Sequence, residues 1–465
     1  MPPSAFRLPR LVVAAFMLTL AACQRGPAVP ELAGYGTLEP AVAAVLTERL
    51  TALSAARTDA DQWGRLAMAL EANGLTPQAK DTYAVATTLP ATHGRWWYHL
   101  ARLRARDGDT AGALAAYDEA IAHSPDYVPA RWRRGQVLFD RGDMVAAEAA
   151  FRVAVNLAPV DSAGVTGLAR VQMAQGKPQD AAATLEALLD RTPDDRYAYQ
   201  VLGTAYRALG RAGDAAEATA AGASGEPRWL DPWASEVGVY RRGFAAMLKE
   251  ATTLGLEGQH AEAIALLERL RTERPDDREL TVYLGGLYAT AGRTADARPL
   301  LDGVLRAFPD DFDATMNLAT AHLFDRAWDD ADRLAARALD LRPRDADATR
   351  LRGVVAWRRG ALDDAERWLG DAAAANPKDA KALAWIGSIR LERRKAAQAL
   401  EAYRAALARD PLLGDALVGG ASAALAAGAL DDATRWLARA RKVAPAHAGL
   451  AEVEQRLQAS GKGRS

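Results

Sequence analysis

The chain has 465 residues, more than one compact hydrophobic core usually accommodates, so we expect several domains or a modular array. Hydrophobic residues make up 50% and aromatic residues only 7%, a composition typical of helices packed through small side chains. The 58 Lys and Arg residues balance the 59 Asp and Glu residues, which excludes a global field that would draw the chain onto nucleic acid. The single cysteine excludes an intramolecular disulfide framework and a cluster of cysteine metal ligands.

The N-terminus has the pattern of an export signal. Arg7 and Arg10 precede an apolar run over residues 11–20, which is too short to span a bilayer. The run ends in Leu-Ala-Ala-Cys at positions 20–23, and this ending resembles the lipobox of bacterial lipoproteins. The resemblance implies that a signal peptide of residues 1–22 is removed. It also implies that Cys23 is lipidated and anchors the chain to a membrane by its acyl chains.

The same resemblance implies a location. Gln24 stands where an aspartate would retain a lipoprotein at the inner membrane, so we expect the outer membrane, with the chain facing the periplasm and residues 23–40 as anchor and linker. Retention at the inner membrane is the less favoured sorting. An ordinary secreted protein cleaved after Ala22 is the alternative to lipidation, but Leu20 lies where that cleavage prefers a small residue.

Three residue types recur along the chain with a period of 34 residues, broken by one step of 48. The alanines are Ala79, Ala113, Ala147, Ala181, Ala215, Ala263, Ala297, Ala331, Ala365, Ala399 and Ala433. The prolines are Pro125, Pro159, Pro193, Pro227, Pro275, Pro309, Pro343, Pro377, Pro411 and Pro445. The glycines are Gly74, Gly108, Gly142, Gly176, Gly210, Gly258, Gly292, Gly360 and Gly428. A fixed period of this length predicts an array of structural repeats.

Each residue type has its own physical role in the repeat. Glycine just after a helix adopts the left-handed cap conformation, and proline after the second helix prevents its continuation. The alanine is small because two helices cross closely there. Between these marks lie amphipathic stretches such as residues 111–122, with Leu114, Tyr117 and Ile121 on one face. Each unit is therefore predicted to be a helix hairpin.

The period and its key positions resemble the tetratricopeptide repeat family. The unit over residues 94–127 carries the pattern at Trp97, Leu100, Ala101, Ala113, Tyr117, Ala120 and Pro125. The resemblance implies an all-α, right-handed superhelical solenoid of about eleven helix hairpins, five over residues 60–229 and six over residues 244–447. Arg326 and Arg394 replace the turn glycine, so the turns in these two units are less regular in sequence.

Three further segments complete the predicted organisation. A single hairpin cannot bury its apolar face, so the ends of the array need caps, and we expect capping helices over residues 41–59 and 448–460, followed by a frayed tail at 461–465. The step of 48 contains an insertion over residues 230–243, in which Trp233 and Pro232 follow Trp229. Two interpretations of it stay open: a packed bend that divides the solenoid, or a loop that docks a partner.

The sequence lacks the motifs of catalysis. It has no Gly-rich phosphate loop with lysine, no Gly-x-Ser-x-Gly elbow and no His-Glu-x-x-His, so we expect no enzyme activity, cofactor, metal site or small-molecule substrate. The six histidines are interpreted as surface or turn residues. They are His93, His99, His123, His260, His322 and His447. The paired aspartates, such as Asp310-Asp311 and Asp363-Asp364, recur with the repeat and are interpreted as helix caps.

The family resemblance also implies where partners bind, because first helices line the concave surface in that family. In the first half the corresponding positions form a basic and aromatic set: Arg95, Tyr98, Arg102, Trp132, Gln136, Arg170, Tyr197, Gln200 and Arg207. In the second half they are more apolar and acidic: Leu248, Glu279, Val282, Asp313, Met316, Thr320, Asp347, Arg350 and Trp357. Arginine and aromatic side chains are typical interface anchors, so the halves are predicted to bind different partners, with an ordinary solvated surface as the alternative.

These features predict a protein-binding scaffold that bridges components of an envelope machine, such as a pilus, secretion, polysaccharide-export or outer-membrane biogenesis system. Its partners would be other envelope proteins, with no nucleic acid, and with the membrane contacted through the lipid anchor only. The alternative function is an accessory subunit or regulator that docks an envelope enzyme, for example a hydrolase or synthase of cell wall or polysaccharide.

Overall fold

The structure of the chain is a computed structural model that describes residues 26–91, 93–222, 229–256 and 258–462. The predicted signal peptide, Cys23 and Pro227 lie outside the described residues. Within these residues the chain is all-helical, with no β-strand. By its contacts it divides into two compact units, one of Met1–Val171 with Arg228–Met247, the other of Gln172–Pro227 with Leu248–Ser465.

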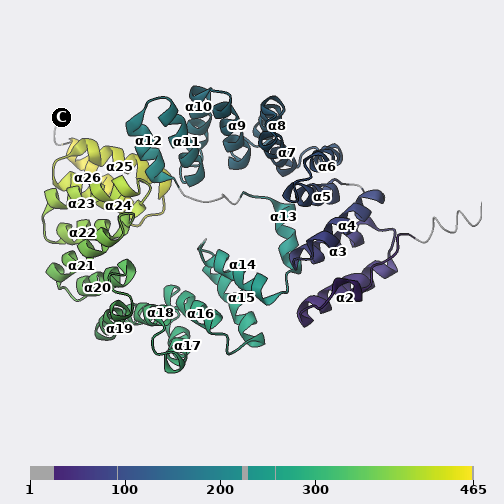
Figure 1. Cartoon of the computed structure of the whole chain (residues 1–465). Helices are drawn as coiled ribbons and strands as arrows, with labels where there is room; N and C mark the ends of the chain where they lie inside the picture. Colours follow the sequence, from purple (N-terminus) through teal and green to yellow (C-terminus); the bar gives the residue numbers. More distant parts are fainter. Residues whose placement is uncertain (1–25, 92, 223–228, 257, 463–465) are drawn as a thin grey trace, which may run out of the picture. The chain divides into compact units, whose positions relative to one another are not determined.

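In the first unit, consecutive helices pack in pairs as hairpins, and the later elements α13 and η2 also belong to this unit (Figure 1). The elements are η1 (Leu32–Tyr35), α2 (Pro40–Ala55), α3 (Ala60–Ala72), α4 (Thr76–Thr88), α5 (Arg95–Arg106), α6 (Thr110–His123), α7 (Val128–Asp140), α8 (Met144–Leu157), α13 (Pro232–Glu236) and η2 (Val237–Tyr240). Helix α9 (Ser162–Ala174) crosses the boundary between the units.

The second unit repeats the same hairpin. Its first group of helices is α10 (Pro178–Leu189), α11 (Arg196–Ala208) and α12 (Ala212–Ala221). Its second group is α14 (Phe244–Leu256, which crosses the boundary), α15 (His260–Glu273), α16 (Arg278–Thr290), α17 (Thr294–Ala307), α18 (Phe312–Phe324), α19 (Trp328–Leu341), α20 (Ala346–Arg358), α21 (Leu362–Ala375), α22 (Ala380–Glu392), α23 (Ala396–Arg409), α24 (Gly414–Ala426), α25 (Leu430–Val443) and α26 (Leu450–Lys462). The all-α solenoid of helix hairpins predicted from the period is confirmed.

The turn inside each hairpin depends on one residue in the left-handed conformation. Gly292, with φ 74°, has this role between α16 and α17. Arg326 (φ 59°) and Arg394 (φ 58°) adopt the same conformation where the sequence lacks glycine. At the first of them, the Ala327 N–H donates to the carbonyl of His322 at 2.9 Å, which satisfies a terminal helix carbonyl. The arginine turns therefore keep the hairpin geometry, at a conformational cost of about 1 kcal/mol each.

Small residues allow the helices of a hairpin to pack closely. The alanines that mark the period are all buried, with none more than 3% exposed. Glycines serve the same purpose on the first helices: a Cβ on Gly353 would lie 2.8 Å from the Leu369 side chain, and one on Gly387 would lie 2.8 Å from the Tyr403 ring. Each of these glycines leaves room for a bulky residue of the following helix. The small residues that recur in the sequence therefore mark the places where helices pack closely.

The paired aspartates cap helices, as the sequence predicted. Asp195, Asp277 and Asp311 precede α11, α16 and α18, and each carboxylate accepts a hydrogen bond at 2.9 Å from the N–H three residues later. The pairs 363–364 and 431–432 lie in the first turns of α21 and α25. Carboxylates at these places satisfy free N–H groups and interact favourably with the helix dipole, which accounts for them without catalysis.

The two ends of the described chain are covered by single helices. Leu46 and Leu53 of α2 are fully buried against the first hairpin, and Leu450 and Val453 of α26 are 7% and 5% exposed against the last one. Among the described residues, no helix has the length and apolar character needed to cross a bilayer. The part of the chain that the structure covers also shows no group of three His, Cys, Asp or Glu side chains arranged to hold a metal ion.

Candidate functional site

A groove on the first helices of the second unit is the first candidate for a partner site. Helices α14, α16 and α18 together line a cavity of about 350 Å³. Leu248, Val282 and Met316 supply its apolar surface, and Glu279 and Asp313 supply negative charge. All five were predicted from the repeat register to lie on the recognition surface, and the structure places them around one hollow. We call it the α14–α18 groove.

The polar side chains of the α14–α18 groove are held in place by neighbouring helices. Asn317 donates from Nδ2 to the carbonyl of Val282 at 3.1 Å, and Tyr283 donates from its hydroxyl to the carbonyl of Thr252 at 3.0 Å. These bonds join α16 to its neighbours, so the groove is preformed. Arg278 forms an ion pair with Asp311, and Arg342 lies 3.9 Å from Asp313. Three carboxylates and one arginine line the groove, so its lining is acidic overall.

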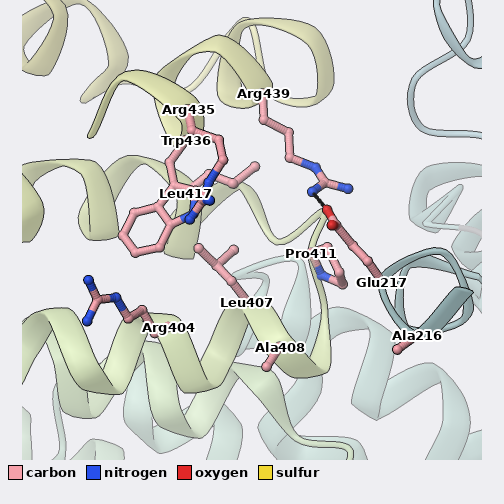
Figure 2. Close-up of a pocket in the computed structure, with 10 residues that line it drawn as sticks. All are labelled: Ala216, Glu217, Arg404, Leu407, Ala408, Pro411, Leu417, Arg435, Trp436 and Arg439. Atoms are coloured by element: carbon pink, nitrogen blue, oxygen red, sulfur yellow. Dashed lines mark hydrogen bonds and ion pairs between the residues drawn. The ribbon is translucent and has the colours of Figure 1, made fainter. Parts of the chain in front are cut away.

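A larger cavity of about 530 Å³ lies elsewhere in the second unit, where α12 meets α23, α24 and α25 (Figure 2). Its lining includes Arg404, Arg435 and Arg439, a set of positive side chains typical of an anion site. Their charges are balanced, however: Arg439 pairs with Glu217, and the other two arginines both bind Asp432 at 2.6 Å. The cavity is therefore a weaker candidate for an anionic ligand than its arginines imply.

In the first unit, the insertion packs back onto the repeats. We call residues 229–243 the insertion segment. It contacts α7, then α5, then α3, in the reverse of their order in the chain, and Figure 1 shows α13 beside α3 and α5. The face that these three helices turn toward it, which we call the first-helix face, consists mainly of Asn73, Arg95, Tyr98, Trp132 and Arg133.

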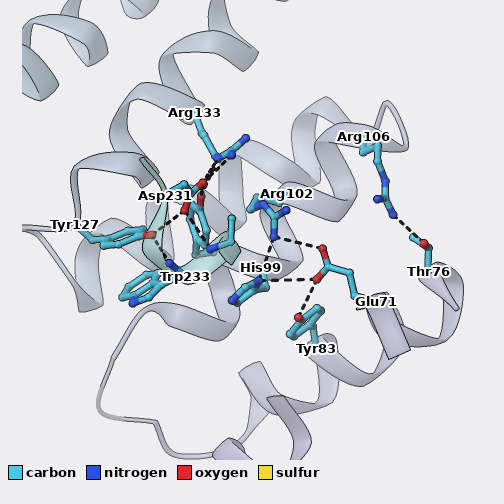
Figure 3. A network of polar contacts seen from close by, with 12 residues as sticks. Glu71, Thr76, Tyr83, His99, Arg102, Arg106, Tyr127, Arg133, Asp231 and Trp233 are labelled. Carbon is cyan, nitrogen blue, oxygen red and sulfur yellow. Dashed lines mark hydrogen bonds and ion pairs between the residues drawn. The ribbon is translucent and has the colours of Figure 1, made fainter. Parts of the chain in front are cut away.

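A buried carboxylate is the centre of this contact. Asp231 accepts hydrogen bonds from the hydroxyls of Tyr98 and Tyr127, the latter at 2.8 Å, and Arg133 approaches it from Nε at 2.8 Å and from NH2 at 2.6 Å (Figure 3). The Asp231 side chain is 5% exposed. Burial raises the pKa of this carboxyl, but the Arg133 charge and the three side-chain donors outweigh burial and lower the pKa below its usual value. Asp231 is therefore ionised, paired and fully hydrogen-bonded.

Aromatic rings surround the carboxylate. Trp233 stacks on Tyr127 with ring centroids 3.5 Å apart and an interplanar angle of 14°, and it meets Tyr98 edge to face at 5.5 Å. Trp229, two residues before the carboxylate, meets Trp132 edge to face at 5.2 Å. Aromatic pairs in these arrangements contribute beyond the area they bury, so the two tryptophans fasten the insertion segment on either side of Asp231.

The far end of the insertion segment is also fixed. Arg95 forms an ion pair with Glu236 at 3.3 Å, and Val237 is 6% exposed within the core of the first hairpin. Asn73 at the end of α3 donates to the carbonyl of Tyr240 at 2.9 Å and accepts from the Arg242 N–H at 2.8 Å. The insertion segment is thus packed along its length; whether it also marks a bend between the arrays stays a prediction.

A second buried cluster lies beneath the first-helix face. Glu71 accepts a hydrogen bond from Tyr83 at 2.9 Å and one from Arg102 at 3.3 Å, and Arg102 also meets His99 Nδ1 at 3.2 Å (Figure 3). His99 stacks on Tyr83 with centroids 5.1 Å apart. Burial lowers the pKa of His99 well below 6.5, and the nearby Arg102, Arg95 and Arg133 lower it further. His99 is therefore neutral.

The sequence-based interpretation of His99 as a surface or turn residue is wrong. Its side chain is fully buried in the middle of α5. A histidine in a run that also contains tryptophan, tyrosine and arginine gives no sequence signal of burial, because each of these residue types occurs on surfaces as well. Its position became clear only from the stacking on Tyr83 and the contact with Arg102.

The structure brings together three of the residues predicted to bind a partner, Arg95, Tyr98 and Trp132, under the insertion segment. Tyr98 is fully buried and Trp132 is 3% exposed, so neither lines an open groove as the repeat register implied. Arg102, also predicted to bind a partner, forms an ion pair with Glu71 in the second cluster. The physical reason is that the insertion segment occupies the face on which these side chains stand. Partner binding by these residues stays a prediction.

The other predicted residues are distributed over both units. Gln136 accepts a hydrogen bond from Arg170 at 2.9 Å in the first unit. On α11 of the second unit, Tyr197 is half-buried and Arg207 is exposed, with NH2 3.1 Å from the Thr204 hydroxyl. Met316 lines the α14–α18 groove, as described above. Trp357 on α20 donates to Glu392 at 2.8 Å. Partner binding by these residues stays a prediction.

Sequence reasoning missed the residues that hold the insertion segment. Tyr127 directly precedes α7, and Arg133 follows Trp132, which was predicted to bind a partner. Asp231 lies in the insertion over residues 230–243, for which the sequence left two interpretations open. Asn73 ends α3 beside the turn glycine. The available signal was the concentration of Trp229, Pro232 and Trp233 in one short segment, and it did not name the residues that the segment contacts.

Comparison with known proteins gives a family. One model described as tetratricopeptide repeat matches residues 65–128, 98–162, 166–226 and 386–448, and a second model of the same description matches residues 256–319 and 289–353. Together these ranges cover more than half of the chain. Protein FlbA of Caulobacter vibrioides is 31% identical over 168 residues, which are 36% of this chain and 28% of that relative. The chain thus matches little more than a quarter of the relative's length.

Solved structures of three proteins resemble parts of the chain. TTC0263, a thermophilic TPR protein of Thermus thermophilus, is 24% identical, with a TM-score of 0.37, and the match covers 39% of this chain and 100% of that one. Yeast Tom70 is 13% identical, with a TM-score of 0.41, covering 87% and 96% of the two chains. Pseudomonas aeruginosa pilF is 13% identical, with a TM-score of 0.38, covering 46% and 96%.

Proposed function

We propose, from the premise that this chain belongs to the tetratricopeptide repeat family and is a protein-binding scaffold, that it is held at the outer membrane by a lipid on Cys23. There it faces the periplasm and bridges components of an envelope machine, such as a pilus, secretion, polysaccharide-export or outer-membrane biogenesis system. The bound partners are other proteins of the envelope, and the chain contributes binding surface and not catalysis.

The α14–α18 groove is the observation that carries the binding part of this proposal. It is preformed, it lies on first helices, and it combines the apolar side chains of Leu248, Val282 and Met316 with the carboxylates of Glu279 and Asp313. A groove of this character suits a protein segment with apolar side chains and positive charge, because burial of the apolar atoms favours binding and opposite charges favour the correct orientation.

The anchored location rests on the N-terminal sequence. Cys23 ends the short apolar run, and Gln24 lacks the charge that retains lipoproteins at the inner membrane. About seventeen residues separate the lipid from the start of α2 at Pro40, a reach of at most roughly 60 Å when fully extended. The binding surfaces would therefore operate close to the membrane, which suits a protein that gathers components there.

Affinity capture from envelope extracts tests the binding part. The chain is compared with the double variant Glu279→Lys with Met316→Lys, which reverses charge and removes apolar surface in the α14–α18 groove. Glu262→Lys on the outer helix α15 is the matched control, since Glu262 is exposed and lies away from the groove. We expect structural proteins of one envelope machine to be captured by the parent chain and the control, and lost from the groove variant. Equal capture by all three chains would exclude the groove.

Labelling of growing cells with radioactive palmitate tests the anchor. We expect the label to enter the parent chain and the chain to fractionate with the outer membrane, and the Cys23→Ser variant to lose both properties. A Cys23→Ser chain that still takes up label, or a parent chain found unlabelled, would contradict the lipid anchor. Capture of one hydrolase or synthase in the previous experiment would favour the role of an enzyme's accessory subunit.

A further inference from the structure

We propose that the first-helix face of α3, α5 and α7 is a peptide-binding site, and that the insertion segment fills it as an internal ligand. Its external ligand is a segment of another protein with the same chemistry: an aspartate that caps a short helical turn, followed by proline and an indole. This proposal rests on the protein-binding function proposed above and names the recognition chemistry of a second surface.

The carboxylate pocket selects an acidic residue. Arg133 and the hydroxyls of Tyr98 and Tyr127 all donate toward one point, which Asp231 occupies. A neutral side chain there would leave two hydroxyls and the half-buried Arg133 guanidinium without a charged acceptor, which is unfavourable. The pocket is therefore built for one negative charge.

The turn after the carboxylate orients the aromatic anchor. Asp231 also accepts from the Ala234 N–H at 3.2 Å, and the Ser235 hydroxyl donates to the Asp231 carbonyl at 3.0 Å. Pro232 occupies the first position of α13, where its missing N–H costs nothing. This self-capped turn directs the Trp233 ring onto the face of Tyr127. The backbone N–H of Trp233 donates to the Tyr127 hydroxyl at 3.0 Å. The turn thus prearranges the carboxylate and the indole together.

The insertion segment contacts the repeats in the manner of a bound peptide, except at Val237, which is buried within the core of the first hairpin. Its backbone bonds include local ones, from Ser235 to Asp231 at 2.9 Å and from Arg241 to Gly238 at 3.0 Å, and it reaches the repeats through side chains and the end of α3. Leu230 is 82% exposed and Val239 is 67% exposed beside the buried anchors. The hairpins beneath it also pack through their own helix pairs, α3 with α4, α5 with α6 and α7 with α8.

A tethered ligand makes the site harder to reach from outside. Because the insertion segment belongs to the same chain, its effective concentration at the site is of millimolar order, and an external segment must outcompete it. The apparent affinity for an external segment is reduced by the fraction of molecules in which the site is empty. The insertion segment therefore carries the same residue types as the external ligand. It also competes with that ligand, so segments that bind the site weakly cannot displace it.

A peptide titration tests the proposal. A fluorescent peptide with the sequence of residues 229–243 is titrated with the purified parent chain and with the double variant Asp231→Ala with Trp233→Ala, and anisotropy is recorded. We expect the peptide to bind the variant at least about tenfold more tightly than the parent, because the variant has lost its internal competitor. A peptide carrying Asp231→Asn should bind the variant about tenfold more weakly than the parent peptide, because it cannot supply the charge.

Two results would overturn the proposal: no binding of the peptide to the variant, or equal binding to both chains. Circular dichroism of the variant checks that its helices are retained. If they are lost, the Asp231→Asn chain replaces it, since the change keeps the shape of the side chain, and the same two results apply. The α14–α18 groove variant should bind the peptide as the parent does, so a failed envelope capture and a failed peptide titration identify different errors.

Discussion

Arg133 and Asp231 form an ion pair with NH2 and Oδ2 2.6 Å apart, although 98 residues separate them in the sequence. The carboxylate is buried and the guanidinium is 31% exposed, so the pair is anchored on one side and hydrated on the other. The contact joins the inserted residues to α7 of the same unit. The stability of the first unit should therefore depend on this ion pair.

Removal of the carboxylate should destabilise the first unit. We expect Asp231→Ala to lower the free energy of unfolding by about 2 to 4 kcal/mol, because Arg133 and two tyrosine hydroxyls lose a shared buried acceptor. Chemical denaturation followed by circular dichroism measures the change. Asp118→Ala is the matched control, since Asp118 pairs with Arg134 at 2.6 Å but is 57% exposed, and its loss should cost less than about 1 kcal/mol. Equal losses in the two variants would contradict the buried network.

The buried histidine should make stability depend on pH. The pKa of His99 is lower in the folded chain than the ordinary value of 6.5, so the unfolded chain binds the extra proton first as pH falls. Its contribution to stability is therefore complete above pH 6.5 and declines below it, by up to about 1.4 kcal/mol per pH unit. Asp231 acts in a separate window, because its lowered pKa removes stability only as pH falls below about 3.8.

Urea denaturation at pH 7.5, 6.5 and 5.5 separates these effects. The His99→Gln chain should be less stable than the parent at pH 7.5 and should show a smaller loss between pH 6.5 and 5.5. If the parent and the variant lose stability in parallel over that interval, His99 is not the group that titrates.

The arginine turns should be improved by glycine. Arg326 has φ 59°, a conformation that glycine adopts without strain, so Arg326→Gly should raise the free energy of unfolding by about 0.5 kcal/mol after the greater entropy of the unfolded chain is included. Gly292→Ala is the reciprocal change at φ 74° and should lower it by about 1 kcal/mol. The two variants should therefore shift the denaturation midpoint in opposite directions, and a shift in the same direction would refute the assignment of these turns.

Two glycines on helices of the second unit should respond oppositely to alanine. A Cβ on Gly387 would lie 2.8 Å from the ring of Tyr403, so Gly387→Ala should cost about 1 to 3 kcal/mol through overpacking. Gly370 in α21 has open space at the same position, so Gly370→Ala should gain about 0.5 to 1 kcal/mol from helix propensity. Thermal unfolding of the two variants checks both signs, and a stable Gly387→Ala chain would contradict the close packing of α22 on α23.

Much of the fold was predictable because its determinants are local. The recurring glycine, proline and alanine each act within one hairpin, and the period predicted helix pairs such as α3 with α4 before any contact was known. Even the turns at Arg326 and Arg394 follow the period, since the surrounding helices impose the left-handed conformation on a residue that does not favour it. Helix α2, at Pro40–Ala55, lies in the stretch 41–59 for which a capping helix was predicted.

The candidate site was predictable only in part. The family resemblance implied that Leu248, Val282 and Met316 share one first-helix surface, and the structure brings them together in the α14–α18 groove. Partner binding there stays a prediction. The arrangement on the first-helix face does not follow from the repeat. Tyr98 was assigned to an open surface by the same register, and the structure shows it covered.

The sequence by itself determined the repeated hairpin, its turns and its caps, since each depends on residues a few positions apart. Only the tertiary structure decided that Asp231 meets Tyr98 and Arg133, which lie 133 and 98 residues away in the chain. A carboxylate, a phenol and a guanidinium have many possible partners, and no periodicity selects among them. The selection comes from the free energy of burying all three together, which exists only once α5 and α7 are already stacked.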